Sequence, residues 1–365
     1  MIDRGSVRVA ALLERARRAG WTAGAAAGWI GTGRRDPVVV AVGRAAVAPT
    51  PVDVTPATWF DLASLTKPLV VGTLGLLAVR WGWFGLDTTV ADVLPDAAGR
   101  PVGTATIAQL LTHTSGLPAW SPIYALTEGR PERALDAVLA LPVVDPGARV
   151  VYSCPGFLLL GWILERRGGA TLDVLFDDHV LRPLGLRDEL GFRPGPDHPV
   201  AAGASQPGAE RRLVRECGLD PAWVPQVGPG LPDDGNARFL GGVAGNAGLF
   251  GSAAGVLGLA RIFIEPGGLL RGEEIGVATA NRTAGREQAR GLGWQLAGSP
   301  GCSAGPSLDR ASFGHTGFTG TSLWIDPTRG VAMTLLANRV HPGHRSTDLH
   351  PLRRRFHRLV VDAVS

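Results

Sequence analysis

The chain contains very little lysine and tyrosine. Of its 36 lysine and arginine residues one is lysine, Lys67, and the other 35 are arginine; the only tyrosines are Tyr124 and Tyr152. A lysine ammonium can lose its proton near neutral pH when it is buried or close to other charges, whereas a guanidinium cannot. Arginine therefore occupies every other basic position, and Lys67 is a candidate for proton chemistry.

Cysteine is also scarce, with Cys154, Cys217 and Cys302 as the only copies. Their number is odd and no two are spaced as Cys-x-x-Cys. These facts argue against a disulfide framework and against a zinc site. We expect no metal and no organic cofactor.

Long uninterrupted apolar runs are missing as well. Glu14, Arg15 and Arg17 interrupt the first apolar segment, so it lacks the apolar core of a signal peptide. Arg80 interrupts the long apolar segment that follows Ser64. We therefore expect no stretch to reach the roughly 18 apolar residues of a membrane span. If Met1 is the native start, the protein is expected in the cytoplasm, without a membrane partner.

The formal net charge is small, +4, and the basic residues are scattered along the chain. A nucleic-acid partner is therefore not expected. The one dense basic run, at 353–358, lies in a helical pattern near the end of the sequence, where a solvated helix face explains it. The oligomeric state stays open.

Apolar periodicity places strands near both ends of the chain and helices in the middle. The turn at 326–330 suggests that the last two strands form a hairpin. The expected helices are 6–19, one beginning near Ser64, 107–111, 132–141, 157–167, 172–181, 253–264 and 350–363; the expected strands are 22–30, 37–44, 292–296, 311–315, 321–325 and 331–337.

This order predicts an α/β (α+β) fold, with an antiparallel β-sheet flanked by helices and an inserted helical domain. Residues 1–62 and 240–365 would form the α/β sandwich domain. Residues 63–239 would form the mainly helical domain, with a long loop region at 191–236 that is rich in Pro, Gly and Asp. The active site would lie between the two domains.

Ser64-Leu65-Thr66-Lys67 has the pattern Ser-x-x-Lys. Pro68 belongs in a first helical turn, so Ser64 should lie at a helix start with Lys67 on the same face. A serine hydroxyl becomes a nucleophile when a base takes its proton, and Lys67 can act so if burial lowers its pKa. The pattern is common by chance, and a surface lysine in a first helical turn is the alternative.

Two further segments carry candidate chemistry. Tyr152-Ser153-Cys154 precedes Pro155, and a phenol near an ammonium can ionise more readily and shuttle protons; a half-buried structural tyrosine is the alternative. His315-Thr316-Gly317 ends an expected strand, whose edge can offer backbone N–H groups to a bound carbonyl. A glycine-rich turn between strands would explain it equally well.

Taken together, these motifs resemble those of the serine β-lactamase and penicillin-binding-protein superfamily, in particular its class C-like branch with the family VIII carboxylesterases. The branch has Ser-x-x-Lys, Tyr-x-Asn and Lys-Thr-Gly in this order. FDLASLTKP, LLTHTSGLP, GGVAGNAGLF and HTGFTGTSLWIDP are also similar, and the likeness runs from about residue 20 to 340. It implies a β-lactamase/transpeptidase-like fold.

The resemblance also implies roles for the motif residues. Ser64 would form the acyl-enzyme, and Lys67 with Tyr152 would handle its proton and later activate water. The backbone N–H groups of Ser64 and Phe318 would form the oxyanion hole. Cys154, His315, Thr316 and Gly317 would line the substrate site.

The sequence departs from the family pattern at two motif positions. Cys154 replaces the amide of the second motif, and a thiol is a weaker hydrogen-bonding group. His315 replaces the lysine of the third motif, and a neutral imidazole binds a substrate carboxylate less strongly. The second departure favours esters or small amides over β-lactams and D-Ala-D-Ala peptides, which carry a carboxylate.

The sequence thus predicts a serine hydrolase that cleaves a small-molecule ester or amide through an acyl-Ser64 intermediate. The alternatives are an acyltransferase with the same acyl-enzyme, a D-Ala-D-Ala peptidase or β-lactamase, and a catalytically impaired scaffold protein, for which Cys154 is the main support. A triad built on His113 is disfavoured because no Gly-x-Ser-x-Gly elbow is present.

Overall fold

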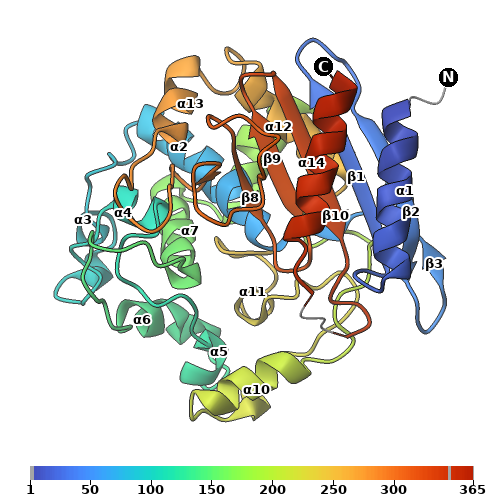
Figure 1. Ribbon diagram of the computed structural model, residues 1–365. Coiled ribbons are helices and arrows are strands. Elements are labelled where there is room, and N and C mark those ends of the chain that lie inside the picture. The colour runs from blue at the N-terminus through green and yellow to red at the C-terminus, as the bar shows by residue number, and fades with distance from the viewer. Residues whose placement is uncertain (1–3, 344–346, 365) are drawn as a thin grey trace.

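The computed structural model describes residues 4–343 and 347–364. In these residues seven strands form one antiparallel sheet in the order β3-β2-β1-β10-β9-β8-β7 (Figure 1). The strands are β1 (Gly24–Gly31), β2 (Val38–Ala46), β3 (Val52–Asp53), β7 (Gln295–Leu296), β8 (Phe313–Thr316), β9 (Ser322–Asp326) and β10 (Val331–Ala337). Segments from the two ends of the sequence therefore meet in the middle of the sheet, where β1 pairs with β10.

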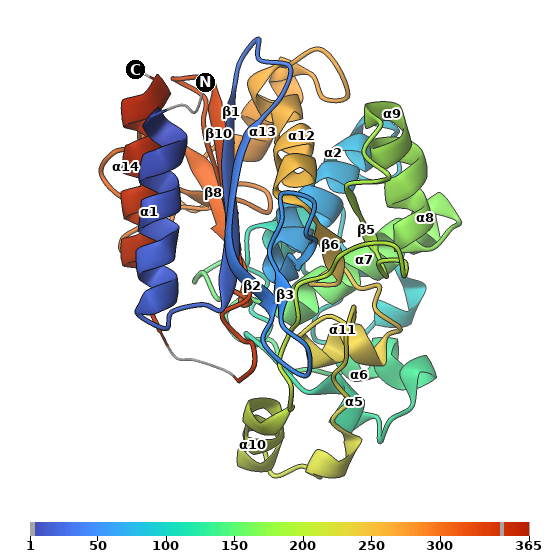
Figure 2. The ribbon, with the colours of Figure 1, turned by 90° about the vertical axis from the view of Figure 1, so that its right-hand side faces the viewer.

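Helices cover both faces of this sheet (Figure 2). Alternate residues of β1 point to opposite faces, as strand geometry requires. Ala25, Ala27 and Trp29 pack with α1 (Arg4–Arg18) and α14 (His350–Val364). Ala26 and Ile30 belong to the larger core on the other face, which α12 (Ala253–Ile264) covers.

A mainly helical part lies beyond α12 and carries most of the remaining core (Figure 1). Its central helix is α7 (Cys154–Gly168), which is buried along most of its length. The other helical elements outside the sheet layer are η1 (Ala63–Leu65), η2 (Lys67–Gly72), α2 (Thr73–Arg80), α3 (Val90–Val93), η3 (Pro95–Ala97), α4 (Ile107–Leu111), α5 (Ile123–Leu126), η4 (Pro131–Arg133), α6 (Ala134–Leu139), α8 (Leu172–Phe176), η5 (Asp177–Leu181), α9 (Arg182–Leu184), α10 (Gly208–Glu216), η6 (Pro221–Trp223), α11 (Gly235–Phe239) and α13 (Gly272–Thr279).

A second, small sheet connects the two parts. Among the described residues it has three short strands in the order β4-β6-β5, namely β4 (Phe60–Asp61), β6 (Leu249–Gly251) and β5 (Leu190–Phe192). Strand β4 leads directly into η1, which contains Ser64. The small sheet therefore fixes the chain just before the candidate nucleophile.

The predicted fold class is confirmed: helices flank a large antiparallel sheet, and the β9–β10 hairpin forms at the expected turn. The prediction of a long loop region at 191–236 is partly wrong, because α10, η6 and the start of α11 lie in it. Of the strand expected at 292–296, only the last two residues form a strand, β7. The small sheet and α13 were not predicted from the sequence. The domain boundaries stay a prediction.

The expectation that no segment is long and apolar enough for a membrane span is wrong. The helical stretch Ala63–Arg80 has 18 residues and meets this requirement by length and composition. However, 83% of it is buried inside the fold. We interpret it as a core helix, because neighbouring elements of the protein already cover its apolar surface.

Candidate active site

The backbone turns sharply just before Ser64. Ala63 has φ of +48°, a conformation that costs free energy for a residue with a Cβ and that concentrates at functional sites. Asp61 holds this turn, because its Oδ1 accepts a hydrogen bond from the N–H of Ala63 at 2.8 Å. Its Oδ2 accepts one from the N–H of Asp233 at 2.7 Å, which ties the turn to the opposite wall of the pocket.

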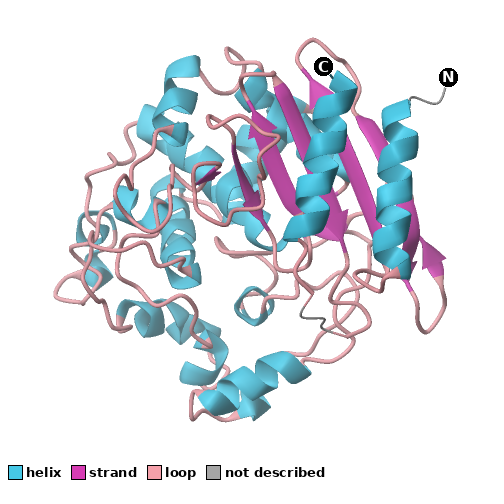
Figure 3. Cartoon of the chain, in the orientation of Figure 1, coloured by secondary structure: helices cyan, strands magenta, loops and turns pink. Residues whose placement is uncertain are grey.

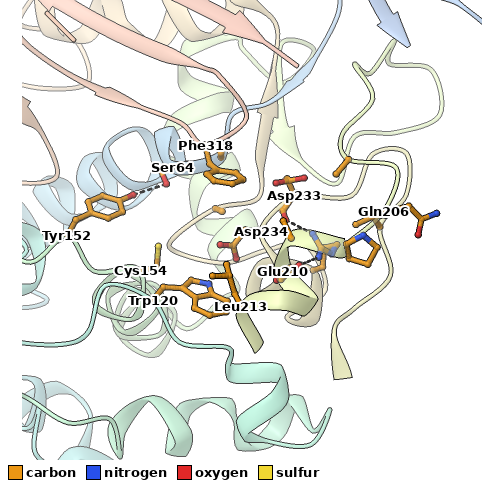
Figure 4. Close-up of a pocket in the computed structure, with 18 residues that line it drawn as sticks. Ser64, Trp120, Tyr152, Cys154, Gln206, Glu210, Leu213, Asp233, Asp234 and Phe318 are labelled. Carbon is orange, nitrogen blue, oxygen red and sulfur yellow. Dashed lines mark hydrogen bonds and ion pairs between the residues drawn. The ribbon is translucent and has the colours of Figure 1, made fainter. Parts of the chain in front are cut away.

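The side chains of Lys67 and Tyr152 both contact the Ser64 hydroxyl, and Figure 4 shows the contact from Tyr152. Lys67 Nζ donates to Ser64 Oγ at 3.1 Å, and Tyr152 Oη donates to the same oxygen at 2.7 Å. The Lys67 side chain is fully buried, and its Nζ also donates to the carbonyl of Asn246 at 2.8 Å. The lysine therefore does not lie on the surface, and the serine is within hydrogen-bond reach of two titratable groups.

Tyr152 is positioned by the start of α7. Ser153 caps this helix, and its Oγ donates to the carbonyl of Pro118 at 2.8 Å. The N–H of Ser153 donates to Nδ1 of His113 at 3.0 Å, and the His113 ring lies 4.6 Å from the Tyr152 ring, centroid to centroid. His113 thus supports the phenol and makes no contact of a catalytic triad.

The pKa values of the two groups beside Ser64 are not lowered as the sequence suggested. Burial lowers the pKa of Lys67, but its interactions with Cys154, Tyr152 and Asp234 raise it, and the net direction is upward. Burial raises the pKa of Tyr152, against the opposing effect of Lys67. These directions do not support an easily deprotonated lysine and phenol in the resting site, where both groups hold their protons at neutral pH.

Cys154 belongs to the same cluster, because its thiol contacts the side chains of Lys67 and Asn246. Burial raises the pKa of this thiol, so it is neutral. Asn246 is fully buried, and neither atom of its side-chain amide has a hydrogen bond of normal geometry to any described residue. An amide left unsatisfied in this way is unusual in a protein interior.

The third motif lies on β8, beside the turn that holds Ser64. A Cβ added to Gly317 would lie 2.0 Å from Thr321 Oγ1 and 2.7 Å from the carbonyl of Leu62, so glycine is needed at this close approach. Thr319 and Thr321 donate from their hydroxyls to the carbonyls of Asp61 and Leu62, at 2.7 and 3.0 Å. These contacts bring the 317–321 turn next to Ser64, with Phe318 on the pocket wall.

His315 is buried, and its pKa lies well below the ordinary histidine value because of desolvation and nearby cations. Its Nδ1 is 2.8 Å from the carbonyl of Thr316, which requires the proton on Nδ1. The imidazole is therefore neutral. It does not line the pocket itself, and neither do Thr316 and Gly317, whereas Ser64, Tyr152, Cys154 and Phe318 do.

Sequence reasoning missed Arg290, a buried cation beside the phenol. Its guanidinium lies 5.8 Å from the centroid of the Tyr152 ring, and its charge lowers the pKa of both His113 and His315. Desolvation lowers the pKa of Arg290 itself to about 10. Arg290 lies in no motif that could have identified it from the sequence. Asn246, the other residue that sequence reasoning missed, lies in the GGVAGNAGLF stretch that resembles the family.

A pocket of about 410 Å³ opens beside Ser64. It lies on the side where α10 and α11 face the nucleophile (Figure 4). The residues that line it are Ala63, Ser64, Trp120, Tyr152, Cys154, Ala204, Gln206, Pro207, Ala209, Glu210, Leu213, Val227, Asp233, Asp234, Gly235, Arg238, Ala247 and Phe318. The unexpected helix α10 thus forms a wall of the site.

The large antiparallel sheet and its flanking helices have the β-lactamase fold, whose members are generally serine hydrolases. The chain belongs to the Beta-lactamase family, whose sequence profile matches residues 9–357. It is 29% identical over 322 residues to an Escherichia coli K12 protein provisionally named D-alanyl-D-alanine carboxypeptidase, covering 80% of this chain and 71% of that protein.

Solved structures show the same fold. EstCE1, described as a hydrolase with promiscuous acyltransferase activity, superimposes with a TM-score of 0.75 at 21% identity, over 98% of this chain and 99% of EstCE1. A penicillin-binding-protein homologue from Caulobacter crescentus gives a TM-score of 0.74 at 23% identity, over 99% and 98% of the two chains. The resemblance expected from the motifs is therefore confirmed for family and fold.

Proposed function

We propose that the protein is a serine hydrolase that cleaves an ester or small amide through an acyl-Ser64 intermediate. The observation that carries this proposal is the double contact on Ser64 Oγ, from Lys67 at 3.1 Å and from Tyr152 at 2.7 Å. A buried lysine and phenol on one hydroxyl are hard to explain as packing, because burying such groups costs free energy. A scaffold protein would have no use for them.

The reactive form has one proton fewer than the resting form. In the resting arrangement Lys67 and Tyr152 both donate to Ser64 Oγ, so neither can accept its proton. Once the Lys67–Tyr152 pair has lost one proton, it takes the Ser64 proton as Oγ attacks the acyl carbon, and then gives that proton to the leaving alcohol or amine. Water attacks the acyl-enzyme in the same way, which releases the acid and restores Ser64.

The developing oxyanion needs hydrogen-bond donors in fixed positions. We assign this role to the backbone N–H groups of Ser64 and Phe318. The threonine hydroxyls of the 317–321 turn support this assignment, because they bind the carbonyls of Asp61 and Leu62 and so hold the turn against the nucleophile.

A neutral ester or small amide fits the site better than a substrate carboxylate. His315 is neutral, and Arg238, the cation on the pocket wall, is paired with Glu210. A carboxylate in the pocket would therefore lack a free cationic partner among the described lining residues. The E. coli relative is named a D-alanyl-D-alanine carboxypeptidase, so D-Ala-D-Ala peptidase activity is also tested. EstCE1 is described as having acyltransferase activity, so acyl transfer is tested as well.

The decisive experiment measures turnover of p-nitrophenyl butyrate and labelling by a serine-directed phosphonate, read by intact mass and peptide mapping. We expect hydrolysis and one label on Ser64, and neither with Ser64→Ala. Added alcohols or amines separate transfer from hydrolysis by their products, and a chromogenic β-lactam and a D-Ala-D-Ala peptide test the carboxylate substrates. A folded wild-type protein that neither turns over an ester nor takes the label would support the scaffold alternative.

A further inference from the structure

The pocket beside Ser64 has an acidic wall. Its described lining residues include three carboxylates, Glu210, Asp233 and Asp234, and one guanidinium, Arg238. Arg238 is almost fully buried, is ion-paired with Glu210, and donates to the carbonyls of Pro232 and Asp233. Groups of the protein therefore already bind the Arg238 guanidinium. The carboxylates of Asp233 and Asp234 determine the remaining charge of the pocket wall.

These two carboxylates differ in their surroundings. Desolvation lowers the pKa of the Arg339 guanidinium, and Asp233 lies near enough to oppose this shift. Asp234 has no ion pair with any residue that the structure describes; its Oδ1 accepts a hydrogen bond from the N–H of Ala237 at 2.8 Å and caps α11. Asp234 also acts on the pKa of Lys67 and of Cys154, which places it close to the nucleophile.

Apolar and aromatic residues line the pocket together with Asp234. Asp234, Trp120, Cys154, Leu213 and Ser64 all line this pocket, and Figure 4 shows the Asp234 carboxylate in the part of the view where Trp120, Cys154 and Leu213 also lie. Trp120 packs on a separate cluster formed by Tyr124, Val214 and Val224, which holds its ring in place. A carboxylate and an indole that line the same pocket match a cation on an apolar body, through charge–charge attraction and cation–π contact.

A metal ion does not fit this place, since the described residues contain no group of three or more His, Cys, Asp or Glu side chains that could hold one. An organic ammonium requires one carboxylate and tolerates apolar neighbours. We propose that Asp234 and Trp120 form an ammonium subsite, so that the preferred substrates are esters or amides that carry an amine within reach of the acyl carbon. This inference rests on the proposed hydrolase function.

Matched substrates test the subsite. Methyl esters of D- and L-leucine are compared with methyl 4-methylpentanoate, which lacks the amine and is otherwise the same, by pH-stat at about pH 6.5, where the amine is protonated. Butyrylcholine and 3,3-dimethylbutyl butyrate form a second pair, with the cation in the leaving group. We expect kcat/KM to favour the cationic member of at least one pair by about ten-fold or more, and the preference to fall with added salt.

Asp234→Asn removes the charge and keeps an N-cap acceptor, because asparagine caps helices as well as aspartate. We expect it to reduce the preference by about ten-fold. Asp220→Asn is the matched control, since Asp220 caps η6 through the N–H of Ala222 and lies outside the pocket; it should leave the preference intact. Equal rates for both members of each pair, or a preference that survives Asp234→Asn, would overturn the proposal.

Binding separates this inference from the proposed function. Calorimetry with Ser64→Ala compares leucinamide with 4-methylpentanamide and does not depend on turnover. Tighter binding of the amine, lost in Ser64→Ala/Asp234→Asn, supports the subsite even if no ester is hydrolysed. Equal binding of the two amides contradicts it even if neutral esters are turned over at Ser64.

Discussion

Replacing Lys67 by arginine changes its proton chemistry while keeping its positive charge. A guanidinium stays protonated at any accessible pH, so it cannot accept the Ser64 proton. We expect Lys67→Arg to lower kcat by roughly 10²- to 10⁴-fold, the usual contribution of a general base. Steady-state kinetics on an ester measure this, with circular dichroism to show that the variant is folded. A folded variant that keeps more than about a tenth of the rate would exclude the base role.

The raised pKa values of Lys67 and Tyr152 predict that activity rises with pH above neutrality, as the pair loses its first proton. Arg290 lies 5.8 Å from the Tyr152 ring centroid, and its charge favours the deprotonated form of either group. Arg290→Gln should therefore move the rising limb of kcat/KM to higher pH by on the order of one unit.

Arg290→Lys is the charge-matched control, and the rising limb of its kcat/KM against pH should stay near that of the wild type. The pH dependence of kcat/KM for a neutral ester measures both variants. An unchanged limb in folded Arg290→Gln would mean that Arg290 supports the structure around Tyr152 without influencing the proton that is lost.

Cys154 and Asn246 form a poorly matched pair beside Lys67, a weak thiol next to an unsatisfied buried amide. An asparagine at 154 can satisfy this amide and bind Lys67 as well. We expect Cys154→Asn to keep kcat or raise it by up to about ten-fold, because a typical hydrogen bond contributes about 0.5–1.5 kcal/mol. Cys217→Asn, at an exposed cysteine, is the control.

Ester kinetics and urea unfolding of the Cys154 and Cys217 variants give the result. A loss of activity in a stable Cys154→Asn protein would show that the thiol has a task of its own.

At the scale of elements, the turn between β4 and η1 depends on a buried carboxyl. Burial raises the pKa of Asp61 from 3.8 to about 7, although two backbone N–H groups oppose this shift. The folded state then holds a proton that the unfolded chain has lost, so Asp61 makes the free energy of unfolding fall as pH rises from about 4 to about 7. The full effect is up to about 4 kcal/mol.

Urea unfolding at about pH 5 and about pH 8 tests this effect, because Asp61→Asn removes the titrating group while other groups stay the same. The wild type should lose more stability between the two pH values than Asp61→Asn does. Equal losses would show that Asp61 is ionised in the folded state throughout. In that case Asp61 would hold the turn as a carboxylate and not as a protonated carboxyl group.

At the scale of the whole molecule, α1 and α14 form a layer on one face of the sheet, with α12 on the other (Figures 2 and 3), and this layer supplies none of the described residues that line the pocket. Leu13 on α1 is fully buried against the sheet. Leu13→Ala should lower the free energy of unfolding by about 2–5 kcal/mol through loss of packing. Val7→Ala, at a position 56% exposed on the same helix, should change it by less than about 0.5 kcal/mol.

Urea unfolding compares the two α1 variants, and kcat/KM at low denaturant should be the same for both. A fall in kcat/KM of folded Leu13→Ala would show that this layer is coupled to the pocket.

The large sheet was predictable because its long strands carry apolar runs, as in 38–42 and 331–337. The two-residue β4 and three-residue β6 have no such pattern; tertiary contacts alone define them. The motif residues Ser64, Lys67 and Tyr152 could be named from their spacing and resemblance. Arg290 and Asp234 could not, because their importance depends on which distant segments fold against them.

The pairing of β1 with β10 has a consequence for biosynthesis. During translation the apolar strand Gly24–Gly31 emerges early, but its neighbour Val331–Ala337 emerges only after some 300 further residues have been added. Until then one edge of the nascent sheet stays open to solvent and to other chains. A ribosome-bound chain stalled before residue 331 should therefore be a target for chaperones.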